Sequence, residues 1–246
     1  MFVTLRAVFR ALMVVFTCLF YLIPLLIVSA IKGHELTRAL QVRKRFCRAA
    51  LRVLNVKLTV EGTPYIAGPA IFISNHRSYI DPLVALQDIK ALPVAKAEVG
   101  EWPLVGYAAK ATGIMYVKRE DRSSRRSTLS GMEKTLDMGY SVLIYPEGTT
   151  TREPKTLPFK KGAFGLAVNK NVPLIPMAIS YDNPDAIWDG PEPFVSHFLQ
   201  MFRKKVNRIT LRYGEPITGD YTHEELLQLT QTWINTQIVE LENRWE

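Results

Sequence analysis

The pattern of apolar and polar residues along the chain predicts strands and helices in turn. Short apolar runs predict strands at Lys57–Val60, Ala70–Ser74, Pro93–Ala95, Ile114–Lys118, Val142–Tyr145, Leu174–Ser180 and Ile209–Tyr213. Helical patterns occur at Pro82–Ile89, Leu104–Ala111, Ser124–Met138, Gly162–Asn169 and His223–Asn243. Strands that alternate with helices form mostly parallel sheets covered by helices. We therefore expect an α/β fold with a mixed, largely parallel sheet flanked by helices.

Residues 1–55 have a different pattern, which predicts membrane-anchoring helices ahead of a main domain at 56–246. Ala11–Ile31 contains no charged residue and is long enough to span a bilayer or to lie deep within one leaflet. Pro24 interrupts this run and would let it bend rather than cross. A cleavable signal peptide is the alternative, because Val28-Ser29-Ala30 resembles a cleavage site.

The next segment, Glu35–Leu54, predicts an amphipathic helix whose apolar stripe is formed by Leu36, Leu40, Cys47, Leu51 and Leu54. We expect this stripe to contact a membrane surface, and the alternative is that it packs on the main domain. Basic residues are denser after the apolar run than before it: Lys32, Arg38, Arg43, Lys44, Arg45, Arg48 and Arg52 follow, against Arg6 and Arg10. This bias favours a main domain on the cytoplasmic side.

Composition narrows the choice of partners. The net charge of +8 would suit nucleic acid or anionic lipid, but the basic residues lie beside a long apolar run, which favours lipid. No nucleic-acid-binding motif occurs in the sequence, so no nucleic-acid partner is expected. The two cysteines form no disulfide framework, and no metal-ligand spacing is present, so we expect neither a metal nor a cofactor.

The strongest candidate chemistry lies just after the run that ends at Ser74. His76 and Asp81 are five residues apart, on what should be a strand-to-helix turn, since Pro82 suits the first turn of the following helix. Histidine can take a proton near neutral pH, and an aspartate on its other ring nitrogen would orient it. The alternative is that Asp81 only caps the helix and His76 only occupies the turn.

Four segments together resemble the motifs of the glycerolipid acyltransferases, the family of 1-acylglycerol-3-phosphate acyltransferases. The first is N-H-x-x-x-x-D with His76 and Asp81, and the second is Gly113 followed six positions later by Arg119. The third, Tyr145–Thr149, is similar to Phe-Pro-Glu-Gly-Thr-Arg, and the fourth is the apolar run Val172–Pro176 between two prolines. The resemblance covers about residues 55–215.

This resemblance implies a membrane-associated enzyme that moves a fatty acyl group from acyl-CoA or acyl carrier protein to the free hydroxyl of lysophosphatidic acid, giving phosphatidic acid. His76 would be the general base and Asp81 would orient it. Membrane lipids, the lysophospholipid acceptor and the acyl donor would be its partners. The substrate-binding residues would be Arg119, which suits phosphate, with Lys96, Glu147, Gly148 and Thr149.

One position departs from the family pattern. Thr150 stands where the third motif usually has arginine, and the next arginine is Arg152. Arg152, Lys160 or Lys161 would compensate, or the acceptor is a lyso-amino-acid lipid such as lyso-ornithine lipid. Two further hypotheses are an inactive membrane lipid-binding protein and a lipid hydrolase that uses the same base. Residues 182–206 predict no regular element, and a substrate-access or membrane-touching loop is one interpretation.

Overall fold

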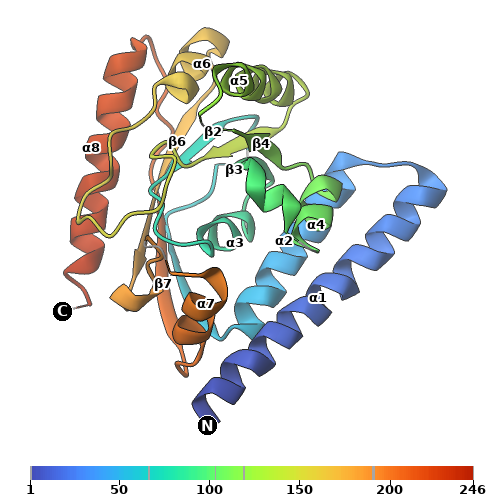
Figure 1. Ribbon diagram of the computed structural model, residues 1–246. Coiled ribbons are helices and arrows are strands. Elements are labelled where there is room, and N and C mark those ends of the chain that lie inside the picture. The colour runs from blue at the N-terminus through green and yellow to red at the C-terminus, as the bar shows by residue number, and fades with distance from the viewer. Residues whose placement is uncertain (1, 66, 103, 119, 190–191, 246) are drawn as a thin grey trace.

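The computed structural model describes residues 2–65, 67–102, 104–118, 120–189 and 192–245. Within them the centre is a seven-stranded sheet with the order β1–β7–β6–β2–β5–β3–β4 (Figure 1). The strands are β1 (Val56–Glu61), β2 (Ile71–Ser74), β3 (Ala91–Lys96), β4 (Met115–Val117), β5 (Ser141–Ile144), β6 (Leu174–Tyr181) and β7 (Asn207–Tyr213). Each overlaps one of the strands predicted from the apolar runs.

The sheet is mixed and largely parallel, as predicted. β6, β2, β5, β3 and β4 run in one direction as successive neighbours. β7 is antiparallel to β6, and β1 is parallel to β7. The carboxyl ends of the five parallel strands therefore meet along one edge, which is where ligands bind in sheets of this kind.

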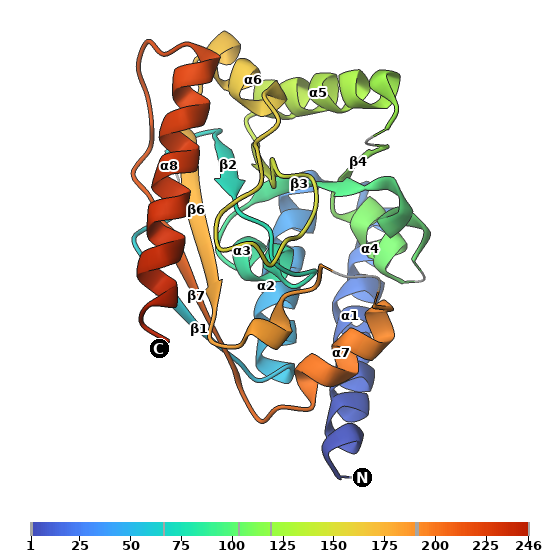
Figure 2. The ribbon, with the colours of Figure 1, turned by 60° about the vertical axis from the view of Figure 1, so that its left-hand side comes forward.

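Helices cover both faces of the sheet (Figures 1 and 2). On one side lie α1 (Phe2–Lys32), α2 (Leu36–Val53), α3 (Asp81–Leu86) and α7 (Phe194–Phe202), with α4 (Val105–Ala111) beside them. On the other lie α5 (Arg122–Asp137), α6 (Gly162–Lys170) and α8 (His223–Glu242). Two short 3₁₀ helices, η1 (Ala97–Glu101) and η2 (Pro184–Ala186), complete the described elements.

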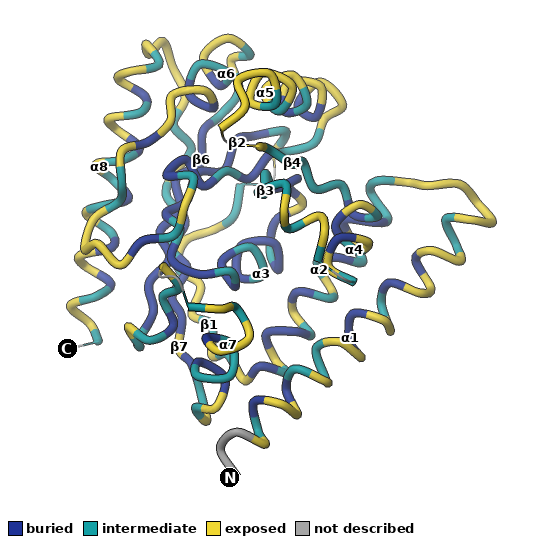
Figure 3. The backbone as a smooth tube through the Cα atoms, in the orientation of Figure 1, coloured by how far each residue is buried: buried dark blue, intermediate teal, exposed yellow. Residues whose placement is uncertain are grey.

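Alternating side chains of the central strands divide the core into two layers. Phe72 and Met177 pack with α2, α3 and α7, whereas Ile71, Ile73 and Val142 pack with α5, α6 and α8. The strands are apolar on both faces because both faces are covered, as in other parallel sheets. Figure 3 shows this buried centre within a more exposed shell of helices.

The apolar stripe of α2 packs on the main domain rather than on a membrane. Leu40, Cys47, Leu51 and Leu54 are all buried, and the last three belong to the core layer that includes α3. Our expectation that this stripe contacts a membrane is therefore wrong, and the alternative holds. The sheet begins at Val56, close to the predicted boundary, but α2 contributes to its core.

Most of α1, by contrast, turns its apolar residues outward, and Figure 3 shows it as an arm beside α2. Phe9, Leu12, Phe16 and Phe20 are each more than half exposed. Leu5–Lys32 is the one helix in the described part of the chain that is long and apolar enough to cross a membrane, by length and composition. These features favour association with a membrane through α1.

The segment 182–206, which predicted no regular element, contains η2 and α7. α7 packs against α1, and Arg10 of α1 donates to the carbonyls of Phe202, Lys204 and Lys205 at its carboxyl end. These bonds satisfy oxygens that have no partner within a helix. Phe194–Phe202 is therefore a helix held by α1 rather than an irregular segment, and the interpretation that 182–206 controls substrate access or touches a membrane stays a prediction.

Candidate active site

The loop after β2 carries the candidate catalytic pair. The side chain of Asn75 accepts a hydrogen bond from the backbone nitrogen of Ile179 (2.8 Å) and donates one to its carbonyl oxygen (2.9 Å), which ties the loop to β6. His76 follows, and α3 begins at Asp81 with Pro82 in its first turn. The His76 Nδ1 atom lies 2.7 Å from Asp81 Oδ2. The structure therefore brings the two residues together on the strand-to-helix turn that the sequence predicts.

Asp81 is completely buried and holds the turn through its carboxylate. Besides the His76 ring, Oδ2 accepts from the backbone nitrogens of Arg77 (2.7 Å) and Ser78 (2.8 Å). The other oxygen, Oδ1, accepts from the hydroxyl of Tyr181. A buried carboxylate needs such donors to offset the loss of water. The aspartate thus fixes both the loop backbone and the orientation of the ring.

A second buried carboxylate, Glu147, holds the same histidine by its backbone. Its Oε1 accepts from the backbone nitrogen of His76 (2.7 Å), and its Oε2 accepts from that of Leu157 (2.8 Å). Burial raises the pKa of Glu147, and its bonds to the Leu157 and His76 nitrogens oppose that rise. Glu147 therefore lies behind the histidine and joins the β2 and β5 loops.

The ring of His76 rests on Tyr145, the residue that follows β5. The two rings are stacked, with centroids 4.3 Å apart and an interplanar angle of 23°. Burial raises the pKa of Tyr145 well above its usual range, so its hydroxyl stays protonated. The His76 side chain is 16% exposed, and no described residue bonds its Nε2 atom. That nitrogen is the one available to a substrate.

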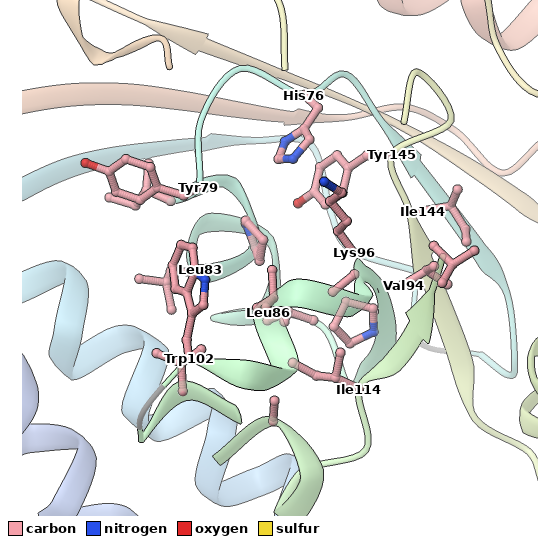
Figure 4. Close-up of a pocket in the computed structure, with 18 of the residues that line it drawn as sticks. His76, Tyr79, Leu83, Leu86, Val94, Lys96, Trp102, Ile114, Ile144 and Tyr145 are labelled. Carbon is pink, nitrogen blue, oxygen red and sulfur yellow. The ribbon is translucent and has the colours of Figure 1, made fainter. Parts of the chain in front are cut away.

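His76 lies on the wall of a cavity of about 1270 Å³. Figure 4 shows the ring with apolar side chains from several elements around the same space, among them Leu83, Leu86, Val94 and Ile114. The cavity also reaches α1 and α2, whose Leu22, Leu25 and Phe46 line it. Ligand sites usually have about 300–1000 Å³ and a mainly apolar lining with a few polar groups. This one is larger and suits a long apolar chain next to a base.

The other predicted substrate-binding residues occupy different places. Lys96 at the end of β3 lines the cavity and pairs with Glu98 (3.0 Å). Gly148 and Thr149 line it as well, and Gly148 has a φ of +75°, at which a side chain would also collide with the Lys160 ammonium.

Arg152 points elsewhere. Its guanidinium pairs with Asp189 (2.6 Å) and donates to the carbonyls of Pro184 and Ile187. The structure therefore does not bring Arg152 to the histidine. The remaining predicted residue, Arg119, lies outside the described residues.

Two residues at the site, Tyr181 and Arg77, were not among the residues predicted from the sequence. Tyr181, at the end of β6, bonds Asp81 across 100 positions of sequence. Arg77 is buried and donates to the carbonyl of Thr151 (2.8 Å), which joins the β2 loop to the segment after Glu147. The only sequence signals were a tyrosine just past a predicted apolar strand and a basic residue inside the first motif.

This arrangement can perform proton transfer. A neutral imidazole whose Nδ1–H faces a carboxylate presents Nε2 as a base, and the carboxylate stabilises the ring once it is protonated. Among the described residues no group of three histidine, cysteine or acidic side chains is placed to hold a metal ion.

Comparisons with known proteins find related acyltransferases. A lyso-ornithine lipid O-acyltransferase of Rhodobacter capsulatus is 27% identical over 165 residues, which cover 63% of this chain and 59% of that protein. A 1-acyl-sn-glycerol-3-phosphate acyltransferase of Limnanthes douglasii is 29% identical over 181 residues, with 71% and 59% covered. The chain thus spans about 60% of the length of these relatives.

A solved structure matches the fold of this chain, and a family model matches its sequence. The crystal structure of the 1-acyl-sn-glycerophosphate (LPA) acyltransferase PlsC from Thermotoga maritima superposes with a TM-score of 0.80 at 22% identity, covering 98% of this chain and 97% of that one. The family model described as Acyltransferase matches residues 57–180, which is half of the chain and includes His76, Asp81 and Glu147. The chain therefore belongs to the acyltransferase family.

Proposed function

We propose that this protein transfers a fatty acyl group from a thioester donor, acyl-CoA or acyl carrier protein, to the free hydroxyl of a lysolipid. Lysophosphatidic acid is the first acceptor we propose, with phosphatidic acid as the product. The observation that carries the proposal is His76, held by Asp81 with its Nε2 atom available, on the wall of a large apolar cavity. The family membership and the relatives support the reaction class.

In the proposed mechanism His76 and Asp81 contribute proton transfer and positioning. His76 Nε2 takes the proton of the acceptor hydroxyl while the alkoxide oxygen attacks the thioester carbonyl. The tetrahedral intermediate collapses, the C–S bond breaks, and the imidazolium returns its proton to the departing thiolate. Asp81 orients the ring and stabilises its positive charge during the interval. No covalent bond to the protein forms.

The cavity wall includes cations that suit a phosphate on either substrate. Lys96, Arg125, Lys160 and Lys161 all line it, from β3, α5 and the start of α6. Basic side chains are the usual partners of phosphate oxygens. The proposed role of Arg119 in phosphate binding rests on the family resemblance.

A lyso-amino-acid lipid, such as lyso-ornithine lipid, is a second candidate acceptor. Thr150 is neutral and lines the cavity where the family pattern has an arginine. Arg152 does not line the cavity, and its charge is paired with that of Asp189, which does. Two of the relatives, from Rhodobacter capsulatus and Rhizobium meliloti, are named lyso-ornithine lipid O-acyltransferases, which supports the same alternative.

We also propose that α1 anchors the protein to a membrane with the domain on the cytoplasmic side. The exposed apolar face of α1 supports the anchor, and the basic residues that follow it support the side. Some of these cations have a second role, since Arg43 and Arg48 bind carbonyls of the main domain.

The proposed reaction is tested with detergent-solubilised full-length protein, labelled acyl-CoA or acyl carrier protein, and either lysophosphatidic acid or lyso-ornithine lipid. We expect His76→Ala to abolish acyl transfer with an unchanged circular dichroism spectrum. The matched control is His223→Ala, at the exposed start of α8, which should retain full activity. Labelled phosphatidic acid supports the first acceptor, and product from the amino lipid alone supports the second.

Two outcomes would contradict the proposal. Release of fatty acid at the same rate with and without an acceptor would identify a hydrolase that uses the same base. Saturable lipid binding without turnover, for every donor and acceptor, would identify a lipid-binding protein. Normal transfer by His76→Ala would leave the reaction in place and overturn the role of the histidine.

A further inference from the structure

The last residue of β6, Tyr181, reaches the catalytic pair from the neighbouring strand. Its hydroxyl donates to Asp81 Oδ1, and its side chain is buried. Among the described residues it is the one donor to that oxygen, whereas Oδ2 accepts from His76, Arg77 and Ser78. Both oxygens of the carboxylate are therefore satisfied, and one of the two depends on a residue outside the acyltransferase motifs.

We propose that Tyr181 is a positioning residue, which sets the orientation of Asp81 and the share of its charge that reaches His76. This inference rests on the proposed function only in so far as His76 is the base. A carboxylate is planar, so a bond to Oδ1 fixes the direction in which Oδ2 faces the ring. The same bond draws negative charge toward the tyrosine and away from the imidazole.

The surrounding structure holds Tyr181 in place. Two residues earlier on β6, Ile179 exchanges two hydrogen bonds with the side chain of Asn75, next to His76. The ends of β6 and β2 are thus joined twice, once through the backbone of Ile179 and once through the Tyr181 hydroxyl. Tyr181 thus binds Oδ1 from β6, whereas the loop itself supplies the donors to Oδ2.

The tyrosine remains a donor at any pH at which the protein would be assayed. Burial is the main cause that raises the pKa of Tyr181 well above its usual range, and the charge of Asp81 adds to it. Its proton therefore stays on the hydroxyl and points at the carboxylate. A phenylalanine would fill the same space without that proton.

The test is Tyr181→Phe, with Tyr213→Phe as the matched control. Tyr213 lies on the adjacent strand β7, is similarly buried, and its hydroxyl has no hydrogen-bond partner among the described residues. We expect Tyr181→Phe to lower kcat about tenfold, because a bond to a charged group is lost. Tyr213→Phe should match the wild type.

The pH profile separates positioning from mere packing. Without the tyrosine, more of the Asp81 charge acts on His76, so the imidazolium is favoured and the acidic limb of kcat/KM moves to higher pH. The other titratable or charged groups around the pair, namely Glu147, Tyr145, Arg77, Cys47 and Tyr213, are unchanged in Tyr181→Phe. The control changes only Tyr213, which acts on Tyr145. If Tyr181 had a purely structural role, Tyr181→Phe would lower kcat/KM at every pH and leave the acidic limb at the same pH.

A measurement without substrate keeps this inference separate from the proposed reaction. The His76 ring is titrated by NMR in labelled full-length protein, where Tyr181→Phe should raise the midpoint and Tyr213→Phe should not. If Tyr181→Phe fails to fold, 3-fluorotyrosine incorporated at position 181 keeps the hydroxyl, strengthens it as a donor and should lower the midpoint. A midpoint unchanged by either substitution at 181 would overturn the inference.

Discussion

Two buried carboxylates, which follow neighbouring strands, bind different parts of His76. Asp81, after β2, binds the imidazole ring, whereas Glu147, after β5, binds the backbone nitrogen of the same residue. Asp81 accepts four hydrogen bonds, and Glu147 accepts two. The first carboxylate faces the group that reacts, and the second faces only main-chain donors.

The difference indicates separate tasks. Most donors to Asp81 are within five residues, so this carboxylate shapes its own loop and sets the chemistry of the ring. The donors to Glu147 are 71 and 10 residues away, so it places one loop relative to another. We infer that loss of charge at Asp81 affects the reaction, whereas loss of an acceptor at Glu147 affects the position of the histidine.

Of the substitutions that test this comparison, Asp81→Asn is expected to lower kcat the most. The amide oxygen can replace Oδ2 and accept from the His76, Arg77 and Ser78 donors, while the amide nitrogen donates to the Tyr181 oxygen. The fold is therefore retained, but the charge that stabilises the imidazolium is lost. We expect kcat to fall about 10³-fold or more, as when the aspartate of a catalytic triad is neutralised. Initial rates with the productive acceptor measure this change.

The control for this substitution is Asp220→Asn, at an exposed position outside the cavity. It should leave both rate and melting temperature unchanged. Asp81→Asn with a rate within a factor of a few of the wild type would show that Asp81 is only a helix-terminal residue.

Local patterns allowed much of this site to be predicted. Apolar runs indicate strands because each central strand is covered on both faces, and Asp81-Pro82 marks the start of a helix. Since parallel strands place their carboxyl ends together, a largely parallel sheet also implies that segments as distant as His76 and Glu147 lie near one edge. That implication needs only the order of elements and their direction.

Other features depend on which elements become neighbours, and no local pattern carries that information. Tyr181 meets Asp81 because β6 lies next to β2, and the α2 stripe is buried because α3 lies against it. Arg152 pairs with Asp189, which lies in a segment for which no element was predicted. The helix Phe194–Phe202 did have an apolar face, but the composition of the longer segment obscured it.

A smaller effect is expected for Glu147→Gln. Glutamine has one acceptor oxygen, so it can bind the backbone nitrogen of His76 or that of Leu157 but not both. The unpaired nitrogen should cost about 1–3 kcal/mol in the free energy of unfolding. Displacement of His76 should lower kcat/KM about 10- to 100-fold. Glu153→Gln, exposed in the same loop, is the control, and equal effects of the two substitutions would contradict the comparison.

The smallest effect concerns the pH dependence of stability. Burial raises the pKa of Glu147 above its ordinary value of 4.5, so the folded protein holds this proton more tightly than the unfolded chain. Stability from this group is then fully present below pH 4.5 and is lost as the pH rises through the folded pKa. The loss is about 1.4 kcal/mol for each pH unit that separates the pKa of the folded protein from that of the unfolded chain. Glu147→Gln removes this dependence.

The expected result is therefore a trend in the difference between the two proteins. The free energy of unfolding of each protein is measured by urea denaturation at a series of pH values. The value for the wild type minus the value for Glu147→Gln should fall as the pH rises from 4.5 toward neutrality. A difference that grows over this interval would mean that the backbone donors outweigh burial at Glu147. In that case Glu147, like Asp81, would be stabilised as an anion by its hydrogen-bond donors. The two carboxylates would then differ only in that Asp81 binds the reacting ring of His76.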